Sequence, residues 1–142
     1  MNFNILFSLA EIFSICQHLL INSIDLKELE LTKTQMCVLF ALIHCDGLSM
    51  TQLAQHAAIS REQATRAVTP LVNLGYVERF QDPSNRKLVL VRLTDQGEAF
   101  LTAETLRIGN KIQINSCDIS SEEERKLQSS IETVLEIKKK LA

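Results

Sequence analysis

The chain has 142 residues, of which 46% are hydrophobic and 23% are charged, and its formal net charge is −2. This balance is ordinary for one soluble globular domain or for a subunit of a small dimer, and it excludes an intrinsically disordered chain. The sequence contains no Gly-rich phosphate loop, no G-x-S-x-G and no H-E-x-x-H motif. We therefore expect no enzymatic activity, no catalytic residue and no cofactor.

The first predicted element is an apolar helix over residues 3–24, in which apolar side chains recur near helical spacing. The segment has no basic n-region and no A-x-A cleavage site, and three polar residues interrupt it: Glu11, Gln17 and His18. We expect neither a signal peptide nor a transmembrane span. The four cysteines show no CxxC spacing, so the expected location is the reducing cytoplasm. Such an apolar terminal helix needs a large partner, either the core of the same chain or a second subunit.

A second helix is predicted from Leu31–Thr32 to Asp46–Gly47. Thr32 is a good N-cap, and Gln35 follows at the spacing of a capping box. The expected buried face consists of Val38, Leu39, Leu42 and Ile43.

A helix-turn-helix is predicted next, with a short helix over residues 52–57 capped by Thr51 and a second helix capped by Ser60. Gly75 is expected just after the second helix, at its C′ position. Pro70 lies inside this helix, where we expect it to bend the helix or, alternatively, to end it early. The expected buried face consists of Ala64, Ala67, Val68, Leu71 and Leu74.

Two strand-like runs, residues 76–80 and 88–93, flank the polar connector QDPSNRK and predict a β-hairpin. Thr94 is expected to cap a long helix, and Ser120 or Ser121 to cap the last one. The apolar series expected for the long helix is Ala99, Phe100, Ala103, Leu106 and Ile112. The fold class is therefore mainly α with a small β-hairpin (α+β).

The helix after Ser60 has a polar outer face suited to DNA. Its N-terminus, with Ser60 and Arg61, favours a phosphate because free N–H groups and the helix dipole point there. Gln63 and Arg66 are long donors of the kind that read adenine and guanine in the major groove. Two shorter residues on this helix, able to reach a phosphate or a thymine methyl, are Thr65 and Thr69. The alternative interpretation is a merely solvated helix face.

Four motifs occur in order: LTKTQMCVLFAL, LSMTQLAQHAAISREQATRAVTPLVNLGYVER, DPSNRKLVLVRLT and LTDQGEAF. With these motifs, residues 31–105 resemble the multiple antibiotic resistance regulator (MarR) family of winged helix-turn-helix transcription factors. The resemblance implies a winged helix-turn-helix with N- and C-terminal dimerisation helices. It divides the chain into a helical dimerisation region, residues 1–30 and 106–142, and a DNA-binding region, residues 31–105.

The resemblance also gives the hairpin a role as a wing over residues 81–87. Arg86 matches the arginine that the family places at the minor groove, where a narrow groove favours Arg. Asp82 matches an acid that orients this arginine. Asn85 departs from the family pattern, which has Asp there. Lys87 is expected to contact a phosphate.

The implied partners are double-stranded DNA with a pseudo-palindromic operator and a second copy of the chain. A small amphipathic or aromatic effector is implied as well, and the protein is expected to be a repressor. Two alternatives stay open, a winged-helix interaction module that binds protein and no DNA, and a thiol-based redox sensor that uses Cys16. We expect Cys16 to be a buried inert thiol, and we expect no metal site, although Cys37 and His44 share a helix face.

Overall fold

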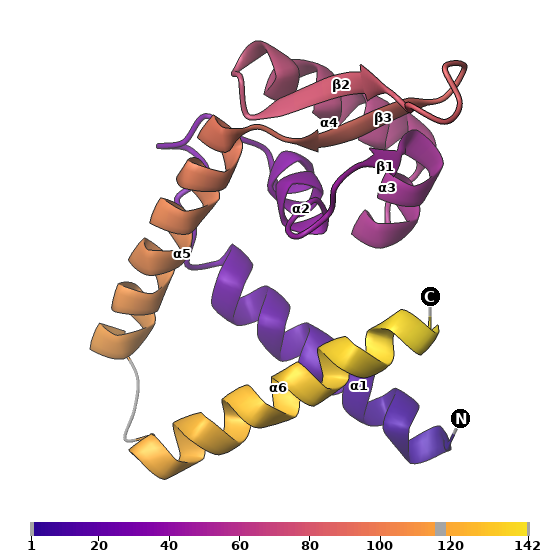
Figure 1. Ribbon diagram of the computed structural model, residues 1–142. Helices are drawn as coiled ribbons and strands as arrows, with labels where there is room; N and C mark the ends of the chain where they lie inside the picture. The colour runs from indigo at the N-terminus through magenta and orange to yellow at the C-terminus, as the bar shows by residue number, and fades with distance from the viewer. Residues whose placement is uncertain (1, 116–118, 142) are drawn as a thin grey trace. The chain divides into compact units, whose positions relative to one another are not determined.

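The computed structural model describes residues 2–115 and 119–141, which fall into two compact units, Met1–Ile112 and Gln113–Ala142. Figure 1 shows a mostly helical chain with one small sheet. The elements in order are α1 Phe3–Cys16, η1 Gln17–Ile21, α2 Lys33–Ala41, β1 Leu48–Ser49, α3 Met50–Ala57, α4 Arg61–Asn73, β2 Val77–Gln81, β3 Val89–Leu93, α5 Asp95–Asn115 and α6 Ser121–Leu141. The predicted fold class, mainly α with a small β part, is confirmed.

The sheet has three antiparallel strands in the order β1-β3-β2, rather than the two of the predicted hairpin. β1 has only two residues, and Leu48 stands opposite Val91 of β3. A strand this short has no alternating pattern, so it could not be predicted from the sequence. In the second pair of strands, Val77 of β2 stands opposite Leu93.

Serine and threonine caps set where α2 and α3 begin. The predicted box of Thr32 and Gln35 is confirmed, because each side chain accepts a hydrogen bond from the other's backbone N–H at 3.1 and 2.8 Å. Ser49, not Thr51, caps α3, so that prediction is wrong. Ser49 has Gln52 three residues later and forms the same reciprocal pair at 3.0 and 3.2 Å, which starts the helix two residues earlier.

α2 ends at Ala41, earlier than the predicted end at Asp46–Gly47. His44 has a left-handed backbone with φ of 58°, which an α-helix does not accommodate. The turn sends the chain into β1, whose pairing with β3 requires an extended backbone. The predicted buried face of α2 is confirmed at Val38, Leu39 and Leu42, whereas Ile43 is half-buried.

The buried core lies within the first unit and joins α2, α3, α4, β2, β3 and α5. α4 contributes four of its five predicted core residues, Ala64, Ala67, Val68 and Leu71. The fifth, Leu74, is 46% exposed, so that prediction is wrong. Leu74 is the C-cap residue, and Gly75 after it has φ of 79°, which turns the chain toward β2.

The predicted apolar face of α5 is only partly right, because Phe100 and Ile112 are half-buried against the core whereas Ala99 and Ala103 are exposed. Leu106 is 66% exposed, whereas Gly97, Leu101, Glu104 and Ile108 are buried. A Cβ at Gly97 would overlap the carbonyl oxygen of Tyr76 and lie 2.9 Å from its carbonyl carbon, so only glycine permits this approach. The contact fixes the rotation of the helix. Glu104 is one of these buried residues. Because a charged residue is rarely buried, the sequence did not indicate that this face of α5 packs against the core.

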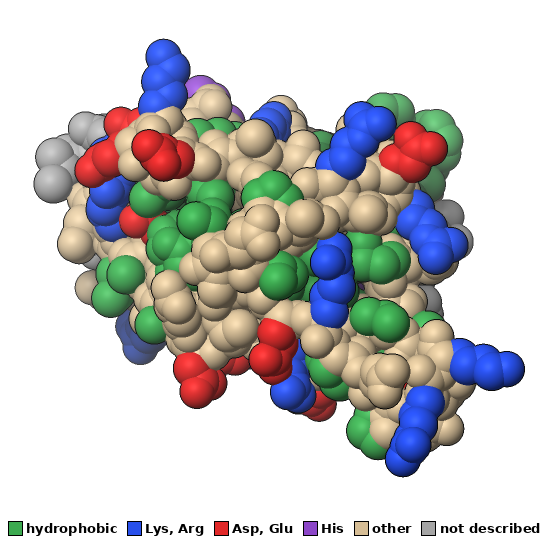
Figure 2. Space-filling model, turned by 90° about the horizontal axis from the view of Figure 1, so that it is seen from above, with side chains coloured by type: hydrophobic (Ala, Val, Ile, Leu, Met, Phe, Trp, Pro, Cys, Tyr) green, Lys and Arg blue, Asp and Glu red, His purple; other side chains and the backbone are tan. Residues whose placement is uncertain are grey.

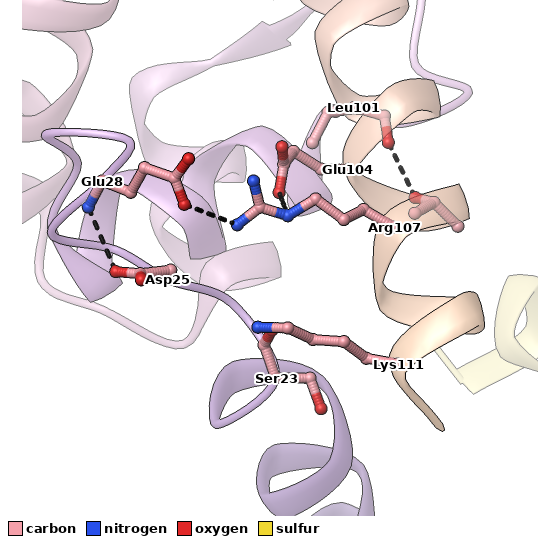
Figure 3. Close-up of polar contacts among 8 residues, drawn as sticks. Ser23, Asp25, Glu28, Leu101, Glu104, Arg107 and Lys111 are labelled. Carbon is pink, nitrogen blue, oxygen red and sulfur yellow. Dashed lines mark hydrogen bonds and ion pairs between the residues drawn. The ribbon is translucent and has the colours of Figure 1, made fainter. Parts of the chain in front are cut away.

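Polar contacts tie α5 to the connector between η1 and α2 (Figure 3). Arg107 pairs with Glu28 at 3.1 Å and approaches Glu104 at 3.8 Å. The Lys111 ammonium donates to the backbone carbonyl of Ser23 at 3.3 Å. Glu104 is 7% exposed, and its Oε2 has no hydrogen-bond partner among the described residues, so Arg107 is the cation that balances its charge.

α1 and the η1 turn that follows it have no buried residue, whereas α2, α3 and α4 each bury at least two. Cys16 is exposed, so the expectation of a buried thiol is wrong for the single chain. The segment Phe3–Ile21 is long and apolar enough to cross a membrane by length and composition, with mean hydropathy 1.5, although its polar residues had indicated otherwise. One such helix near an N-terminus is weak support for a membrane span, because signal sequences and core helices share these properties.

α6 belongs to the second unit and begins at a predicted cap. The Ser120 hydroxyl accepts from the backbone N–H of Glu123 at 3.3 Å, and Glu123 accepts from the Ser120 N–H at 2.9 Å. Hydrogen bonds from the Ser120 backbone and side chain lower the pKa of the Glu123 carboxyl below its ordinary value. The apolar side chains Leu127, Ile131, Val134, Leu135 and Ile137 are all exposed.

Candidate nucleic-acid interface

The predicted helix-turn-helix consists of α3, a tight turn and α4. Ala58 ends α3 in the left-handed conformation with φ of 53° and ψ of 44°. A left-handed alanine costs about 1 kcal/mol, so the turn is held by its surroundings. The N–H of Ile59 donates to the carbonyl of Ala54 at 3.0 Å, and Ser60 then caps α4. Because α4 buries its apolar face, its opposite face is left open to solvent.

All six candidate residues on α4 and its cap lie on this open face. The exposed residues are Ser60, Arg61, Gln63, Thr65, Arg66 and Thr69. α4 also continues past Pro70 to Asn73, so the alternative in which Pro70 ends the helix early is wrong. The carbonyl of Pro70 accepts from the N–H of Leu74 at 2.9 Å, which completes the final turn. The face is thus continuous along the whole helix.

Most short polar side chains on this face already have a partner within the chain. Ser60 and Gln63 form a capping box at 3.1 and 2.9 Å. The Thr65 hydroxyl donates to the carbonyl of Arg61 at 3.0 Å, and that of Thr69 donates to the carbonyl of Thr65 at 3.2 Å. An adenine contact by Gln63 stays a prediction and requires the side chain to leave the cap. The long cations Arg61 and Arg66 are the groups best placed to reach a ligand.

The cation Arg79 of β2 also reaches this face and was missing from the sequence-based candidates. Its Nη2 donates to the hydroxyl of Thr69 at 3.0 Å, a contact between sheet and helix. The sequence contained a usable sign, because alternation along the strand places Arg79 on the same side as buried Val77. That side of β2 faces α4.

The wing tip is shaped by Asp82 and Asn85. The Asp82 carboxylate accepts from the N–H of Ser84 at 2.9 Å, and its backbone N–H donates to Leu88 at 2.9 Å. The Asn85 side chain accepts from the N–H of Lys87 at 3.3 Å. Arg86 and Lys87 are both exposed at the tip. Among the described residues no ion pair joins Asp82 to Arg86, so an orienting role for Asp82 stays a prediction.

The basic residues of this region are not equivalent. Arg92 pairs with Glu78 at 2.5 Å, and its guanidinium lies 4.2 Å from the centre of the Phe80 ring. Across the described part of the chain, ion pairs to acids involve none of the others: Arg61, Arg66, Arg79, Arg86 and Lys87. Figure 2 looks from above Figure 1, onto the side with β2, β3 and α4, and shows Lys and Arg side chains at separate points.

Metal ligands do not converge within the described ranges, where no group of three or more His, Cys, Asp or Glu side chains is placed to hold an ion. Cys37 is half-buried, and His44 is exposed in the turn that follows α2.

Two kinds of comparison with known proteins bear on this interface. Residues 31–89, which include α2, the helix-turn-helix and β2, match the MarR family. The chain is 28% identical over 97 residues to YdgJ of Bacillus subtilis, an uncharacterised HTH-type transcriptional regulator, and 28% identical over 78 residues to a second one, YybA. These matches cover 68% and 55% of this chain, but only 59% and 52% of the relatives.

Solved structures share the fold at lower identity. RV1404 from Mycobacterium tuberculosis superposes with a TM-score of 0.69 at 20% identity, covering 93% of this chain and 90% of that one. A mutant of MarR from E. coli gives 0.68 at 23% identity, with 95% and 97% covered. The transcriptional regulator BldR from Sulfolobus solfataricus gives 0.65 at 23% identity, with 96% and 99% covered. Residues 31–89 are therefore similar to the MarR family, and the chain shares the winged-helix fold of these solved structures.

Proposed function

We propose that the protein is a sequence-specific DNA-binding transcriptional regulator, and that it acts as a homodimeric repressor released by a small effector. The observation that carries this proposal is the open face of α4, which presents Arg61 and Arg66 on the side opposite the core. α4 would lie in the major groove, and the wing would lie against the adjacent minor groove. The relatives named as HTH-type regulators support this function.

The homodimer is supported by α1 and α6, which expose apolar side chains along most of their lengths. A second copy of the chain would cover these surfaces. Pairing would also place two copies of α4 on successive major grooves, so the operator would be a pseudo-palindrome. Location in the cytoplasm follows from this function, because the DNA is there.

The effector we propose is a small amphipathic or aromatic molecule. The first unit contains a cavity of about 380 Å³ between the turn after α2 and α5, with apolar Ile43, Leu93 and Leu101 beside polar His44 and Glu98. A ligand there would release DNA only if it bound more tightly to the conformation that misfits the operator.

The first experiment is selection of bound sequences from a random DNA pool, followed by titration of operator and random duplex across a salt series. Neutralisation of phosphates predicts a steep loss of affinity, with a slope of about −0.9 per phosphate contact. Enrichment of a palindromic sequence is the result expected. A winged-helix module that binds protein instead would show no enrichment and no steep slope.

The variant Arg66→Ala tests α4, the recognition helix that we propose to lie in the major groove. We expect it to weaken operator binding by about 1–3 kcal/mol per half-site, because a base or phosphate contact is removed. Thermal stability should change little, since Arg66 is exposed. The matched control is Asn73→Ala, at the far end of the same face, which should retain operator affinity. If Arg66→Ala instead lost much of its thermal stability but bound the operator as before, α4 would not present this face to DNA.

Redox control is a second candidate function, favoured by the exposure of Cys16. Operator affinity before and after treatment with peroxide, compared with a Cys16→Ser variant, separates the two. Loss of affinity only in the unsubstituted protein would support a thiol sensor.

A further inference from the structure

We propose that Arg79 is a phosphate-binding residue of the DNA interface and that Thr69 is the residue that positions it. The inference rests on the proposed DNA-binding function and adds a contact that bridges the recognition helix and the wing. The sequence does not single out Arg79 by motif, and the structure brings it to α4 from a different element.

The first step is the path of the Arg79 side chain. Arg79 is the middle residue of β2 and stands opposite Val91 of β3, which is fully buried. Alternation puts Arg79 on the α4 side of the sheet, two residues beyond buried Val77. Arg79 itself is exposed and reaches Thr69 at 3.0 Å. Its charge therefore stands where the open face of α4 meets the sheet.

The second step is the hydrogen bonding of Thr69. Its hydroxyl donates to the carbonyl of Thr65 at 3.2 Å, which uses the one proton that a hydroxyl carries. The oxygen is then an acceptor for the guanidinium of Arg79. In this arrangement Thr69 has no proton left to donate to a phosphate or a base. Its effect on DNA would pass through Arg79.

The third step is the contrast between Arg79 and Arg92, which lie on the same small sheet. Arg92 is neutralised by Glu78 and lies over the Phe80 ring. Arg79 contacts a neutral hydroxyl, and no carboxylate pairs with it in the part of the chain that is described. A guanidinium has five N–H donors, so donors are left for the two oxygens of a phosphate.

The fourth step identifies the ligand as a phosphate of duplex DNA rather than a base. Arg79 comes from the sheet, beside the exposed face of α4, and a side chain beside a groove-bound helix meets the sugar–phosphate backbone first. A contact of this kind fixes the register of the protein on the duplex and carries no base preference. Arg79 should therefore strengthen binding to operator and random duplex alike.

The competing interpretation is that the Arg79–Thr69 hydrogen bond only fastens β2 to α4. Salt dependence separates the two, because a fastening bond within the protein releases no counterions when DNA binds. The charge-matched pair of variants is Arg79→Gln and Arg92→Gln, each of which removes one positive charge from the same sheet.

In the full-length protein, Arg79→Gln should flatten the slope of log affinity against log salt by about 0.9 per subunit. For a dimer bound at both half-sites, the unsubstituted protein should then lose about tenfold more affinity than the variant between about 50 and 200 mM salt, on operator and random duplex alike. Arg92→Gln should leave the slope unchanged. Thermal unfolding of both variants checks that the wing is folded.

Variants of Thr69 test the positioning role. Thr69→Val, which keeps the shape and removes the hydroxyl, should lose affinity, whereas Thr69→Ser should retain it. In the double variant, Thr69→Val should add nothing to the loss caused by Arg79→Gln. Independent losses would overturn the positioning role.

The outcomes also separate this inference from the proposed function. An unchanged salt slope in Arg79→Gln, together with weakened binding in Arg66→Ala, would overturn the role of Arg79 and leave DNA binding intact. Absence of any salt-dependent binding of the unsubstituted protein to duplex DNA would overturn both.

Discussion

The winged-helix region, residues 31–105, and α1 are both rich in apolar residues, yet the first contains a buried core and the second buries no residue. Met36, Leu39 and Leu53 of the winged-helix region are fully buried. In α1, by contrast, Phe3 is 70% exposed and Phe13 is 61% exposed. An apolar composition alone therefore does not determine which side chains are buried. The winged-helix region has a buried core of its own, whereas the apolar side chains of α1 are exposed.

The largest effect is expected from a charge placed on the apolar stripe of α1. Ile12 lies on the same helical stripe as Ile5, Leu9 and Leu19, and it is 51% exposed in the single chain. If a second copy buries this stripe, Ile12→Glu should abolish the dimer, because an unpaired buried charge costs several kcal/mol. Sedimentation should show a change from about 32 kDa to one chain of 16.0 kDa.

The control is Ser14→Glu, which adds the same charge on the opposite side of the helix. This variant should remain dimeric. A 16.0 kDa species for the unsubstituted protein at micromolar concentration would remove the dimer and with it the proposed partner of α1.

The next largest effect is expected at Gly97, where the winged-helix region is packed most tightly. Gly97→Ala should destabilise the protein by about 3 kcal/mol or more, because the new Cβ would overlap the carbonyl oxygen of Tyr76. For Gly109, in the same helix, no described atom beyond its chain neighbours and the adjacent helix backbone lies within 4 Å of the place that a Cβ would take. Gly109→Ala should therefore stabilise by about 0.5–1 kcal/mol. Denaturant unfolding of both variants measures the contrast, and equal effects would contradict it.

These two glycines also show where sequence reasoning succeeds and where it stops. Caps are local, so Thr32, Ser60 and Thr94 were identified correctly, although Thr51 was chosen in place of Ser49. The rotation of α5 is set by Tyr76, which is far away in sequence from Gly97 and carries no sign of the contact. Sequence therefore predicted that α5 exists and where it begins, but not which face it buries.

In the candidate interface, too, local features could be predicted from the sequence, whereas a contact between two elements could not. Exposure of Arg66 followed from the helical wheel, because the apolar face of α4 is unambiguous, and Arg61 was predicted from its place at the helix N-terminus. Gln63 was predicted to contact a base. The S-x-x-Q spacing also indicates its role in the capping box with Ser60. The contact of Arg79 with Thr69 joins two elements, so no local pattern could give it.

A moderate loss of stability is expected when Arg107, which connects α5 to the segment between η1 and α2, is replaced. Arg107→Met leaves the carboxylate of Glu104, which is only 7% exposed, without its cation, and should cost about 1–3 kcal/mol. Glu28, the other partner of Arg107, has a side chain that is 63% exposed. Glu28→Gln should therefore cost less than about 1 kcal/mol. Thermal unfolding compares the two, and a larger effect at Glu28 would mean that the buried pair contributes little.

The smallest effect is expected at the wing tip, the most exposed part of the winged-helix region. Arg86→Ala should weaken operator binding slightly, and more for A·T-rich than for G·C-rich flanks, because a narrow minor groove concentrates negative potential. Lys87→Ala should weaken both flanks alike, as a phosphate contact does. Neither change should affect stability, since both side chains are exposed.

The last prediction concerns whether Asp82 orients Arg86. Its carboxylate accepts from the Ser84 N–H at 2.9 Å, so Asp82→Asn preserves an acceptor for the turn and removes only the charge. If the charge orients Arg86, this variant should lose affinity although it makes the wing more positive. If Asp82 serves only the turn, Asp82→Asn should bind as well as the unsubstituted protein or better, and Asp82→Ala alone should bind less tightly. Equal affinity of Arg86→Ala and the unsubstituted protein on every flank would show that the hairpin is not a wing that contacts DNA, and the protein-interaction module would then be the better interpretation.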